Sequence, residues 1–233
     1  MTVQPNINNN FFEGNYKDVW RKLILPGLTE AEVDFIIEIA DLKPKNRALD
    51  LMCGYGRHSL ELGRRECIVT AIDNSAAYVK EIETAVEKEG LKIKAVLADV
   101  IDVDFDGKYE TAICMGNSFA FFNKQDALKL LHNVASALNK HGKLIINTYM
   151  LGEIAIKYFK EKDWFYVDDY KYLTENKYFF NPTRIESDHI IMKTGMEAEV
   201  IKGIDYIFTV SEFTEILNTA GFSLTEMYSN CYR

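Results

Sequence analysis

The segment from Asp50 to Ser59, DLMCGYGRHS, constrains the fold most, because an apolar strand signal runs into it and a helix signal follows it. Gly54 and Gly56 stand where the chain has to turn sharply between the two. Glycine has no Cβ and adopts positive φ without strain, so the backbone of such a turn can pass close to a ligand. The N–H groups that open the following helix carry a partial positive charge. The segment therefore predicts a nucleotide-binding turn between a strand and a helix.

Two acids bracket this turn. Asp50 lies four residues before Gly54, and Asp73 follows Asp50 by 23 residues, at the end of the apolar run CIVTAID. An acid at position 50 would repel the pyrophosphate that the turn of a dinucleotide fold faces. An acid at position 73 lies where doubly wound folds bind ribose hydroxyls. We therefore expect a nucleoside with a cationic tail and no phosphate, a description that S-adenosylmethionine fits.

With Arg57 and His58 after the second glycine, residues 45 to 150 resemble the class I S-adenosylmethionine-dependent methyltransferases of small-molecule type. The resemblance implies a Rossmann-like fold, S-adenosyl-L-methionine as cofactor and S-adenosyl-L-homocysteine as product. It places Asp50 near the methionine amino group, Asp73 on the ribose and Asp99 on the adenine amine. Met52 departs from the family, where a glycine is more usual, and suggests a different backbone path.

The cofactor-binding residues expected on this basis are Asp50, Met52, Gly54, Gly56, Arg57, Asp73, Asn74, Asp99, Val100 and Met115. Plainer interpretations stay open for some of them. Gly54 and Gly56 are alternatively ordinary turn glycines, and Asp73 is alternatively an acid at a helix N-cap. Asp50 is alternatively a strand-end acid that bonds turn amides, and Asp99 alternatively belongs to a solvated, acid-rich loop.

The segment MGNSFAFF, Met115 to Phe122, ends the expected fourth strand, where the ligand crevice of a doubly wound sheet opens. We expect Asn117, Ser118 and Phe119 on the substrate side, with Tyr16 and Trp20 as part of a roof that excludes water. Ordinary core packing is the alternative for these aromatic side chains. His58 is weighed as a general base or as a positional residue. No catalytic residue is assigned, because the sulfonium already activates the methyl group and alignment suffices.

Strand and helix signals alternate from residue 45 to residue 150, which predicts right-handed βαβ units. The expected fold is α/β, with a doubly wound, mostly parallel sheet and an inserted antiparallel β subdomain after the fifth strand. Four segments are expected: an N-terminal helical cap over 1–44, the cofactor-binding core over 45–150, an inserted antiparallel region over 151–210 on the lid and substrate side, and a final helix and strand over 211–233.

Local signals refine this division. Thr29 followed by Glu32 has the pattern of a helix-capping box. Turns are expected at Asn181-Pro182 and Lys202-Gly203, and Ser211 is expected to cap the last helix. SLTEMYSN, residues 223–230, is expected as a sixth strand. The family's seventh strand has no counterpart in this sequence, either because the sequence is truncated or because that strand is replaced, and an unpaired sheet edge is the expected cost.

Composition excludes several classes of function. The formal net charge is −8 and the sequence has no basic run, so we expect no nucleic-acid partner. No stretch approaches the ~18 apolar residues of a membrane span, so no membrane partner is expected. The four cysteines lack metal-ligand spacing, and no metal is expected. We expect a cytoplasmic monomer or homodimer with a small-molecule substrate.

Two rival functions remain at this point. A nicotinamide-dependent oxidoreductase would favour a third glycine near residue 59, where Ser59 stands, and no acid at position 50. A noncatalytic S-adenosylmethionine-binding module would keep the nucleoside pocket without substrate access.

Overall fold

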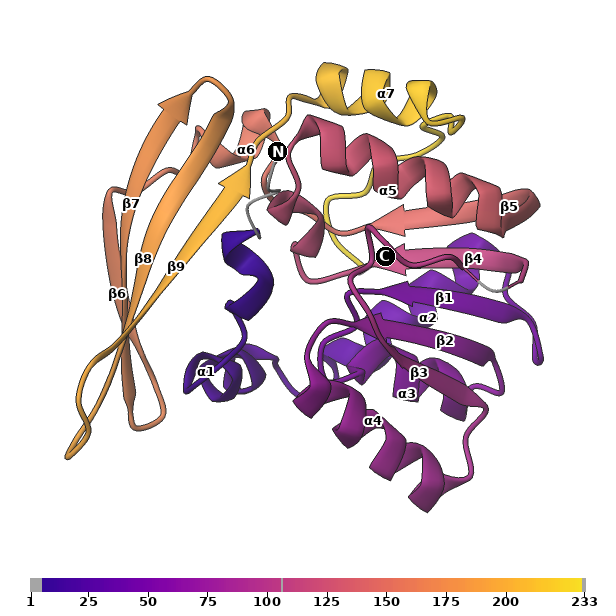
Figure 1. The fold of residues 1–233 in the computed structure, drawn as a ribbon, viewed down its shortest axis with the longest axis horizontal. Coiled ribbons are helices and arrows are strands. Elements are labelled where there is room, and N and C mark those ends of the chain that lie inside the picture. Colours follow the sequence, from indigo (N-terminus) through magenta and orange to yellow (C-terminus); the bar gives the residue numbers. More distant parts are fainter. Residues whose placement is uncertain (1–5, 106, 232–233) are drawn as a thin grey trace. The chain divides into compact units, whose positions relative to one another are not determined.

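The computed structural model describes residues 6–105 and 107–231, in two compact units (Figure 1). The α/β unit comprises Pro26–Phe119, Lys124–Thr148 and Ser211–Arg233, and the antiparallel unit comprises Met1–Leu25, Ala120–Asn123 and Tyr149–Val210. The four segments expected from the sequence stay a prediction; the contacts group the described residues up to Leu25 with the antiparallel unit. The first five residues of the expected N-terminal cap lie outside the described residues.

The α/β unit is built on a five-stranded sheet in the order β3-β2-β1-β4-β5. Its strands are β1 (Arg47–Leu51), β2 (Ile68–Asp73), β3 (Ile93–Leu97), β4 (Tyr109–Cys114) and β5 (Leu138–Ile146). All four neighbouring pairs are parallel, and Asp50 lies beside Ala71 of β2 and Ile113 of β4. Parallel pairing requires crossover connections, which the intervening helices supply. The predicted doubly wound fold is therefore confirmed.

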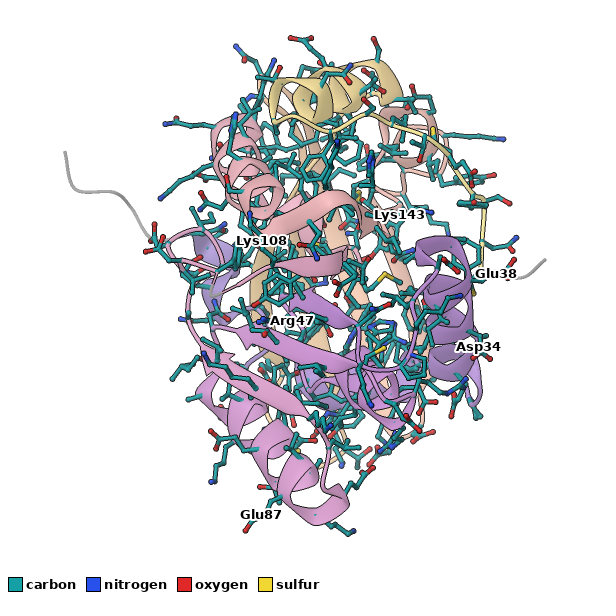
Figure 2. The ribbon with its side chains drawn as sticks, turned by 90° about the vertical axis from the view of Figure 1, so that its right-hand side faces the viewer. Asp34, Glu38, Arg47, Glu87, Lys108 and Lys143 are labelled. Carbon is teal, nitrogen blue, oxygen red and sulfur yellow. The ribbon has the colours of Figure 1, made fainter. Side chains whose placement is uncertain are left out.

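The helices of this unit are α2 (Leu28–Ala40), α3 (Arg57–Arg64), α4 (Ala76–Glu89), α5 (Lys124–Ala137) and, from Ser211 on, α7 (Val210–Thr219). The 3₁₀ turn η2 (Ser118–Phe121) begins in this unit and ends in the antiparallel unit. Val33 and Ile36 of α2 and Leu62 of α3 are fully buried against the sheet residues Val69 and Ile113. Lys143 of the edge strand β5 donates to the carbonyl of Ile39 in α2 (Figure 2). Arg47, at the start of the central strand β1, lies over the Tyr109 ring of β4, with 5.0 Å between the guanidinium and the ring centroid.

The antiparallel unit contains a four-stranded sheet in the order β6-β7-β8-β9. Its elements are η1 (Ile7–Asn10), α1 (Tyr16–Leu23), α6 (Gly152–Ala155), β6 (Lys162–Val167), β7 (Tyr170–Phe180), β8 (Thr183–Lys193) and β9 (Glu199–Tyr206). Consecutive strands form antiparallel hairpins, as the predicted insertion requires, and the turn at Asn181-Pro182 is confirmed. An apolar cluster that includes Phe11, Val19 and Ile191 joins the N-terminal segment to one face of the sheet.

The turn expected at Lys202-Gly203 is wrong, because both residues lie inside β9 and Gly203 pairs with Ser187. This glycine serves close packing. A Cβ at position 203 would lie 2.6 Å from the Phe11 ring, so the ring can rest on the strand only where a side chain is missing.

The strand expected over residues 223–230 is also wrong, since those residues form no strand in the structure. Leu224, Met227 and Tyr228 are exposed and are not spaced two residues apart, as burial on one face of a sheet requires. The Tyr228 ring instead meets Phe35 of α2 edge-on, with 4.9 Å between centroids. In Figure 2 the yellow C-terminal trace runs beside α2, near Glu38 and Asp34. β5 thus ends one side of the sheet.

Two predicted helix caps are wrong. Gly27, with φ 81°, occupies the cap position of α2, and Thr29 lies inside the helix. α7 begins at Val210, before Ser211, and the Glu153 carboxylate accepts the Val210 N–H at 3.0 Å. In the part of the chain that the structure describes, no helix has both the length and the apolar composition needed to cross a membrane.

Candidate cofactor site

Four neighbouring strands bring the predicted cofactor residues to one edge of the sheet. Asp50 is the next-to-last residue of β1 and Asp73 is the last residue of β2. Asp99 and Met115 follow β3 and β4. Because all these strands are parallel, their carboxyl ends share one edge, where doubly wound folds bind their ligands. The structure therefore brings together residues that lie up to 65 positions apart in the sequence.

The turn after β1 has the backbone conformation that close approach requires. Met52, Gly54 and Gly56 have φ values of 54°, 56° and 82°. Met52 thus takes the left-handed conformation that a glycine adopts without strain, at the position where a glycine was the family expectation. A Cβ at position 56 would lie 2.6 Å from Ile82 of α4, whereas a Cβ at position 54 would meet nothing within 4 Å. Gly56 is therefore needed for packing, and the space beside Gly54 is open.

Asp50 is 1% exposed and accepts a hydrogen bond of 2.6 Å from the Ser59 hydroxyl of α3. Burial raises the pKa of the Asp50 carboxyl, and this rise is opposed by the neighbouring His58, by the Ser59 hydrogen bond and by Arg57. A carboxylate in such a place is costly unless a cation compensates it. Its environment suits a cationic ligand group.

Asp73 is 9% exposed and is held by backbone amides. Its two oxygens accept from the N–H groups of Gly54 at 2.8 Å and Ser75 at 2.9 Å. Burial raises the pKa of the Asp73 carboxyl, while the amides of Ser75, Gly54 and Asn74 oppose the rise. These bonds fix the carboxylate beside the glycine turn, with lone pairs left over for further donors such as hydroxyls.

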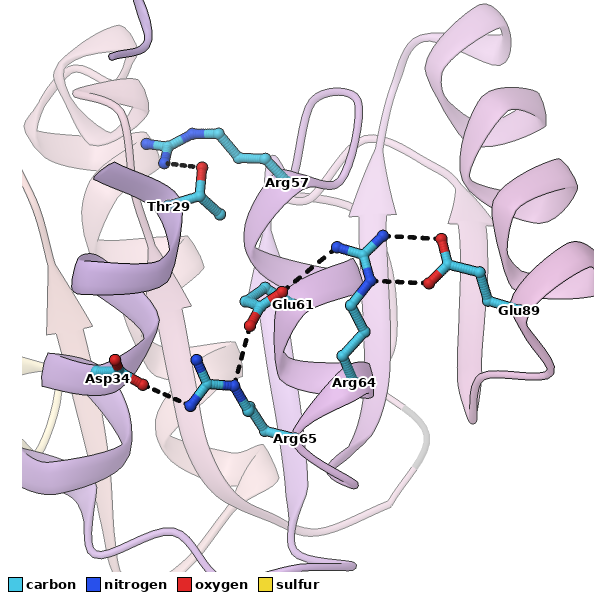
Figure 3. Close-up of polar contacts among 7 residues, drawn as sticks. All are labelled: Thr29, Asp34, Arg57, Glu61, Arg64, Arg65 and Glu89. Atoms are coloured by element: carbon cyan, nitrogen blue, oxygen red, sulfur yellow. Dashed lines mark hydrogen bonds and ion pairs between the residues drawn. The ribbon is translucent and has the colours of Figure 1, made fainter. Parts of the chain in front are cut away.

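Glu32, which the sequence indicated only as part of a capping box, contacts the two basic residues that follow the glycine turn. Its carboxylate, on α2, accepts from Arg57 and from His58 Nε2, the latter at 2.9 Å. Arg57 also donates to the Thr29 hydroxyl at 3.2 Å (Figure 3). Burial raises the pKa of the Glu32 carboxyl, but the hydrogen bonds from His58 and Arg57 outweigh it and hold the pKa below its ordinary value. The predicted Arg57 is therefore tied to α2.

The remaining cofactor-side predictions lie at the neighbouring strand ends. Asn74 is exposed next to Asp73, Asp99 is half-buried and accepts the Ile101 N–H at 3.0 Å, and Val100 is buried. Met115 packs partly against the apolar cluster beneath the sheet. Their contacts with a cofactor stay predictions.

Of the three predicted substrate-side residues after β4, each has an internal partner. Asn117 has a φ of 69° and accepts from the Thr148 hydroxyl at 2.9 Å. Ser118 donates to the Met115 carbonyl at 3.2 Å, and Phe119, 2% exposed, packs edge-on against Phe213. These contacts give the segment a fixed shape, and its role toward a substrate stays a prediction.

Tyr16 and Trp20 belong to α1 in the antiparallel unit, where the buried polar groups are neutral. The Tyr16 hydroxyl is hydrogen-bonded to Tyr172, which in turn is hydrogen-bonded to His189 Nδ1. Burial raises the pKa of Tyr16 well above its ordinary value and lowers that of His189 to about 4. His189 Nε2 is buried without a hydrogen-bond partner among the described residues. Trp20 packs near Phe12. No pattern in the sequence predicted these hydrogen bonds, because they depend on the pairing of β7 with β8.

Comparison with known proteins agrees with this architecture. A family model described as a methyltransferase domain matches residues 48–142. The glycine/sarcosine N-methyltransferase of Halorhodospira halochloris is 33% identical over 136 residues, which cover 57% of this chain and 51% of that protein. A second glycine/sarcosine N-methyltransferase, from Parasynechococcus marenigrum, is 28% identical to this chain. The chain spans about half the length of each of these two relatives.

Solved structures share the fold. An S-adenosylmethionine-dependent methyltransferase from Clostridium acetobutylicum aligns with a TM-score of 0.71 and 18% identity, covering 93% of this chain and 94% of that one. The CcbJ methyltransferase from Streptomyces caelestis aligns with a TM-score of 0.75 and 16% identity, covering 88% of each chain. Residues 48–142 of this chain thus match a methyltransferase domain, and the chain has the fold of these solved S-adenosylmethionine-dependent methyltransferases.

Proposed function

We propose that this protein transfers the methyl group of S-adenosylmethionine to a small-molecule acceptor. The observation that carries the proposal is the pair of buried acids, Asp50 and Asp73, on either side of the glycine turn. Their direct hydrogen-bond donors are a hydroxyl and backbone amides, so both are free to receive donors from a ligand. Two buried anions disfavour a diphosphate and favour a nucleoside with a cationic tail.

The residues at the strand ends suit the parts of that cofactor. Asp50 would hold the methionine ammonium, Asp73 the ribose hydroxyls and Asp99 the adenine amine, while the open space beside Gly54 admits the chain that joins them. When bound, the cofactor supplies a methyl group on a sulfonium, which needs no further activation. What the protein then contributes is alignment of the acceptor and exclusion of water.

An amine is the acceptor that we propose first, because the relatives from Halorhodospira and Parasynechococcus bear the name glycine/sarcosine N-methyltransferase. Asn117, Ser118, Phe119, Tyr16 and Trp20 are the residues proposed on the acceptor side. In the reaction the uncharged nitrogen forms a bond to the methyl carbon as the carbon–sulfur bond breaks, and S-adenosylhomocysteine leaves. The nitrogen's extra proton passes to solvent, so no dedicated base is required.

Turnover of a panel of acceptors tests this function. The protein is incubated with S-adenosylmethionine and glycine, sarcosine, larger amines, phenols or thiols, and both S-adenosylhomocysteine and the methylated product are quantified. We expect equal amounts of the two products with at least one amine. Turnover of phenols or thiols alone would overturn the choice of nitrogen. Cofactor binding without turnover of any acceptor would favour the noncatalytic module instead.

We further propose that the protein acts in the cytoplasm as a monomer or homodimer, on small molecules and not on nucleic acid. Cys53, Cys67, Cys114 and Cys231 are all free thiols, which suits a reducing compartment. Light scattering coupled to size-exclusion chromatography would measure the oligomeric state.

A further inference from the structure

One carboxylate fixes both basic side chains that follow the glycine turn. Arg57 and His58 are the first two residues of α3, directly after Gly56, and both hydrogen-bond to Glu32 Oε2. All three side chains are at least 88% buried, with 11%, 5% and 12% exposure for Arg57, His58 and Glu32. Glu32 is therefore the point at which α2 is joined to the start of α3.

The same two basic side chains act electrostatically on Asp50, the acid proposed to hold the cofactor's ammonium. His58 and Arg57 both stabilise the charged form of its carboxyl. The hydrogen bond that Asp50 accepts comes from Ser59, the next residue of α3. Arg57 and His58 thus lie near Asp50 but are hydrogen-bonded to Glu32 instead.

Loss of the Glu32 charge would change this balance. A buried guanidinium without its counterion is strongly disfavoured and seeks another anion. Asp50 is a buried carboxylate nearby, because it accepts the hydrogen bond from Ser59, two residues after Arg57 in α3. A guanidinium drawn toward Asp50 would compete with any ammonium that the same carboxylate binds, because both need the same lone pairs.

We propose that Glu32 is a positioning residue for the methionine end of the cofactor, since it restrains Arg57 and His58 and so leaves Asp50 available to the ligand's ammonium. The inference rests on the proposed function. It concerns the amino-acid end of the ligand alone, and the nucleoside end, beside Asp73, is not affected.

Two ligands separate this role from a purely structural one. S-adenosylhomocysteine has both ends, whereas 5′-methylthioadenosine has the nucleoside and the sulfur but no ammonium. Calorimetry on Glu32→Gln is expected to show about a tenfold loss of affinity for S-adenosylhomocysteine, about 1.4 kcal/mol, and a change below about twofold for 5′-methylthioadenosine.

Glu61→Gln is the matched control. Glu61 is also a buried acid that binds two arginines, Arg64 at 3.3 Å and Arg65 at 2.9 Å, but it lies farther along α3 (Figure 3). Its loss removes a similar set of ion pairs, so we expect a similar fall in thermal stability with both ligand affinities unchanged.

Equal losses for both ligands, no loss for either, or tighter binding of S-adenosylhomocysteine by Glu32→Gln would each overturn the inference. Should that variant not fold, Glu32→Asp keeps the charge but shortens the reach, and it is expected to lose about threefold for S-adenosylhomocysteine alone; an unchanged ratio of the two affinities would overturn the inference equally. Failure of the unmodified protein to bind either ligand would instead overturn the proposed function.

Discussion

Burial favours the neutral form of the titratable groups in both units, but acid is expected to act in opposite directions on the carboxyls of one unit and the imidazole of the other. In the α/β unit, Asp50 and Asp73 are buried carboxyls surrounded by a hydroxyl, backbone amides and nearby basic side chains. In the antiparallel unit, Tyr16, Tyr172 and His189 form a hydrogen-bonded chain whose pKa values all move toward the neutral form. A carboxyl becomes neutral when it takes up a proton, whereas the His189 imidazole becomes charged.

This difference determines how protonation changes the stability of each unit. A buried carboxyl whose pKa is raised destabilises the fold whenever it is ionised, and a ligand cation can offset that cost. A buried neutral imidazole adds stability that acid removes. Protonation in acid should therefore stabilise the fold through the carboxyls and destabilise it through the imidazole. Substitutions in each unit should separate effects on ligand binding from effects on stability.

The largest effect is expected for Asp50→Asn. The amide keeps an acceptor for the Ser59 hydroxyl but cannot pair with an ammonium, so affinity for S-adenosylhomocysteine should fall about a hundredfold, about 2.7 kcal/mol. The thermal midpoint of the ligand-free protein should rise at neutral pH, since a buried charge is removed. The gain should shrink on acidification, because the raised pKa means that the folded wild-type protein takes up its proton first. Calorimetry measures the affinity and thermal unfolding measures the midpoint. A fall in the midpoint together with the affinity would contradict the view that the Asp50 charge destabilises the ligand-free fold.

Acid should weaken the antiparallel unit through His189. Its pKa of about 4 lies below the ordinary 6.5, so the unfolded chain binds the proton first and stability falls as the pH drops from 6.5 toward 4. From pH 7 to pH 5 the loss should be about 2 kcal/mol.

The substitution His189→Gln removes this titration and keeps a polar partner for Tyr172. The slope of unfolding free energy against pH should flatten in this variant and stay unchanged in His132→Gln, on the exposed side of α5. Equal slopes in all three proteins would contradict the neutral assignment of His189.

Asp73→Asn sharpens the contrast between the two acids. Each Asp73 oxygen accepts a backbone N–H, and an amide would turn its own NH₂ toward Gly54 or Ser75. We expect a stability loss of about 1–2 kcal/mol, opposite in sign to that of Asp50→Asn, together with about a tenfold weaker affinity for S-adenosylhomocysteine. An unchanged affinity would remove Asp73 from the proposed ribose contact.

The smallest effect is expected for Gly54→Ala, whose matched control is Gly90→Ala. Both glycines have positive φ, 56° and 67°, and a Cβ at either would meet nothing within 4 Å. Each substitution should cost about 1 kcal/mol of stability from backbone strain. Weaker cofactor binding is expected for Gly54→Ala alone, by about threefold, since that methyl group enters the space beside the turn. Equal affinities in the two variants would show that this space is not used.

The sequence predicted the features that depend on local order. Glycines between an apolar strand and a helix, and acids at two strand ends, are set by short-range patterns, and parallel pairing then brings the acids to one edge. Glu32 could not be assigned this way, because its spacing from Thr29 is also that of a capping box, and its true partners lie 25 and 26 residues away. The Tyr172–His189 contact depends on the register of β7 against β8, and the alternation of apolar and polar residues along each strand does not determine that register. Residues 223–230 have strand-forming residue types without the two-residue period that fixes a face.

Calorimetric titration of the unmodified protein at pH 7 with S-adenosylhomocysteine and, separately, with NAD tests the central claim most directly. Paired buried acids beside the glycine turn should give one saturable site for S-adenosylhomocysteine and no heat of binding for NAD. Saturable binding of NAD in the absence of any binding of S-adenosylhomocysteine would contradict the account.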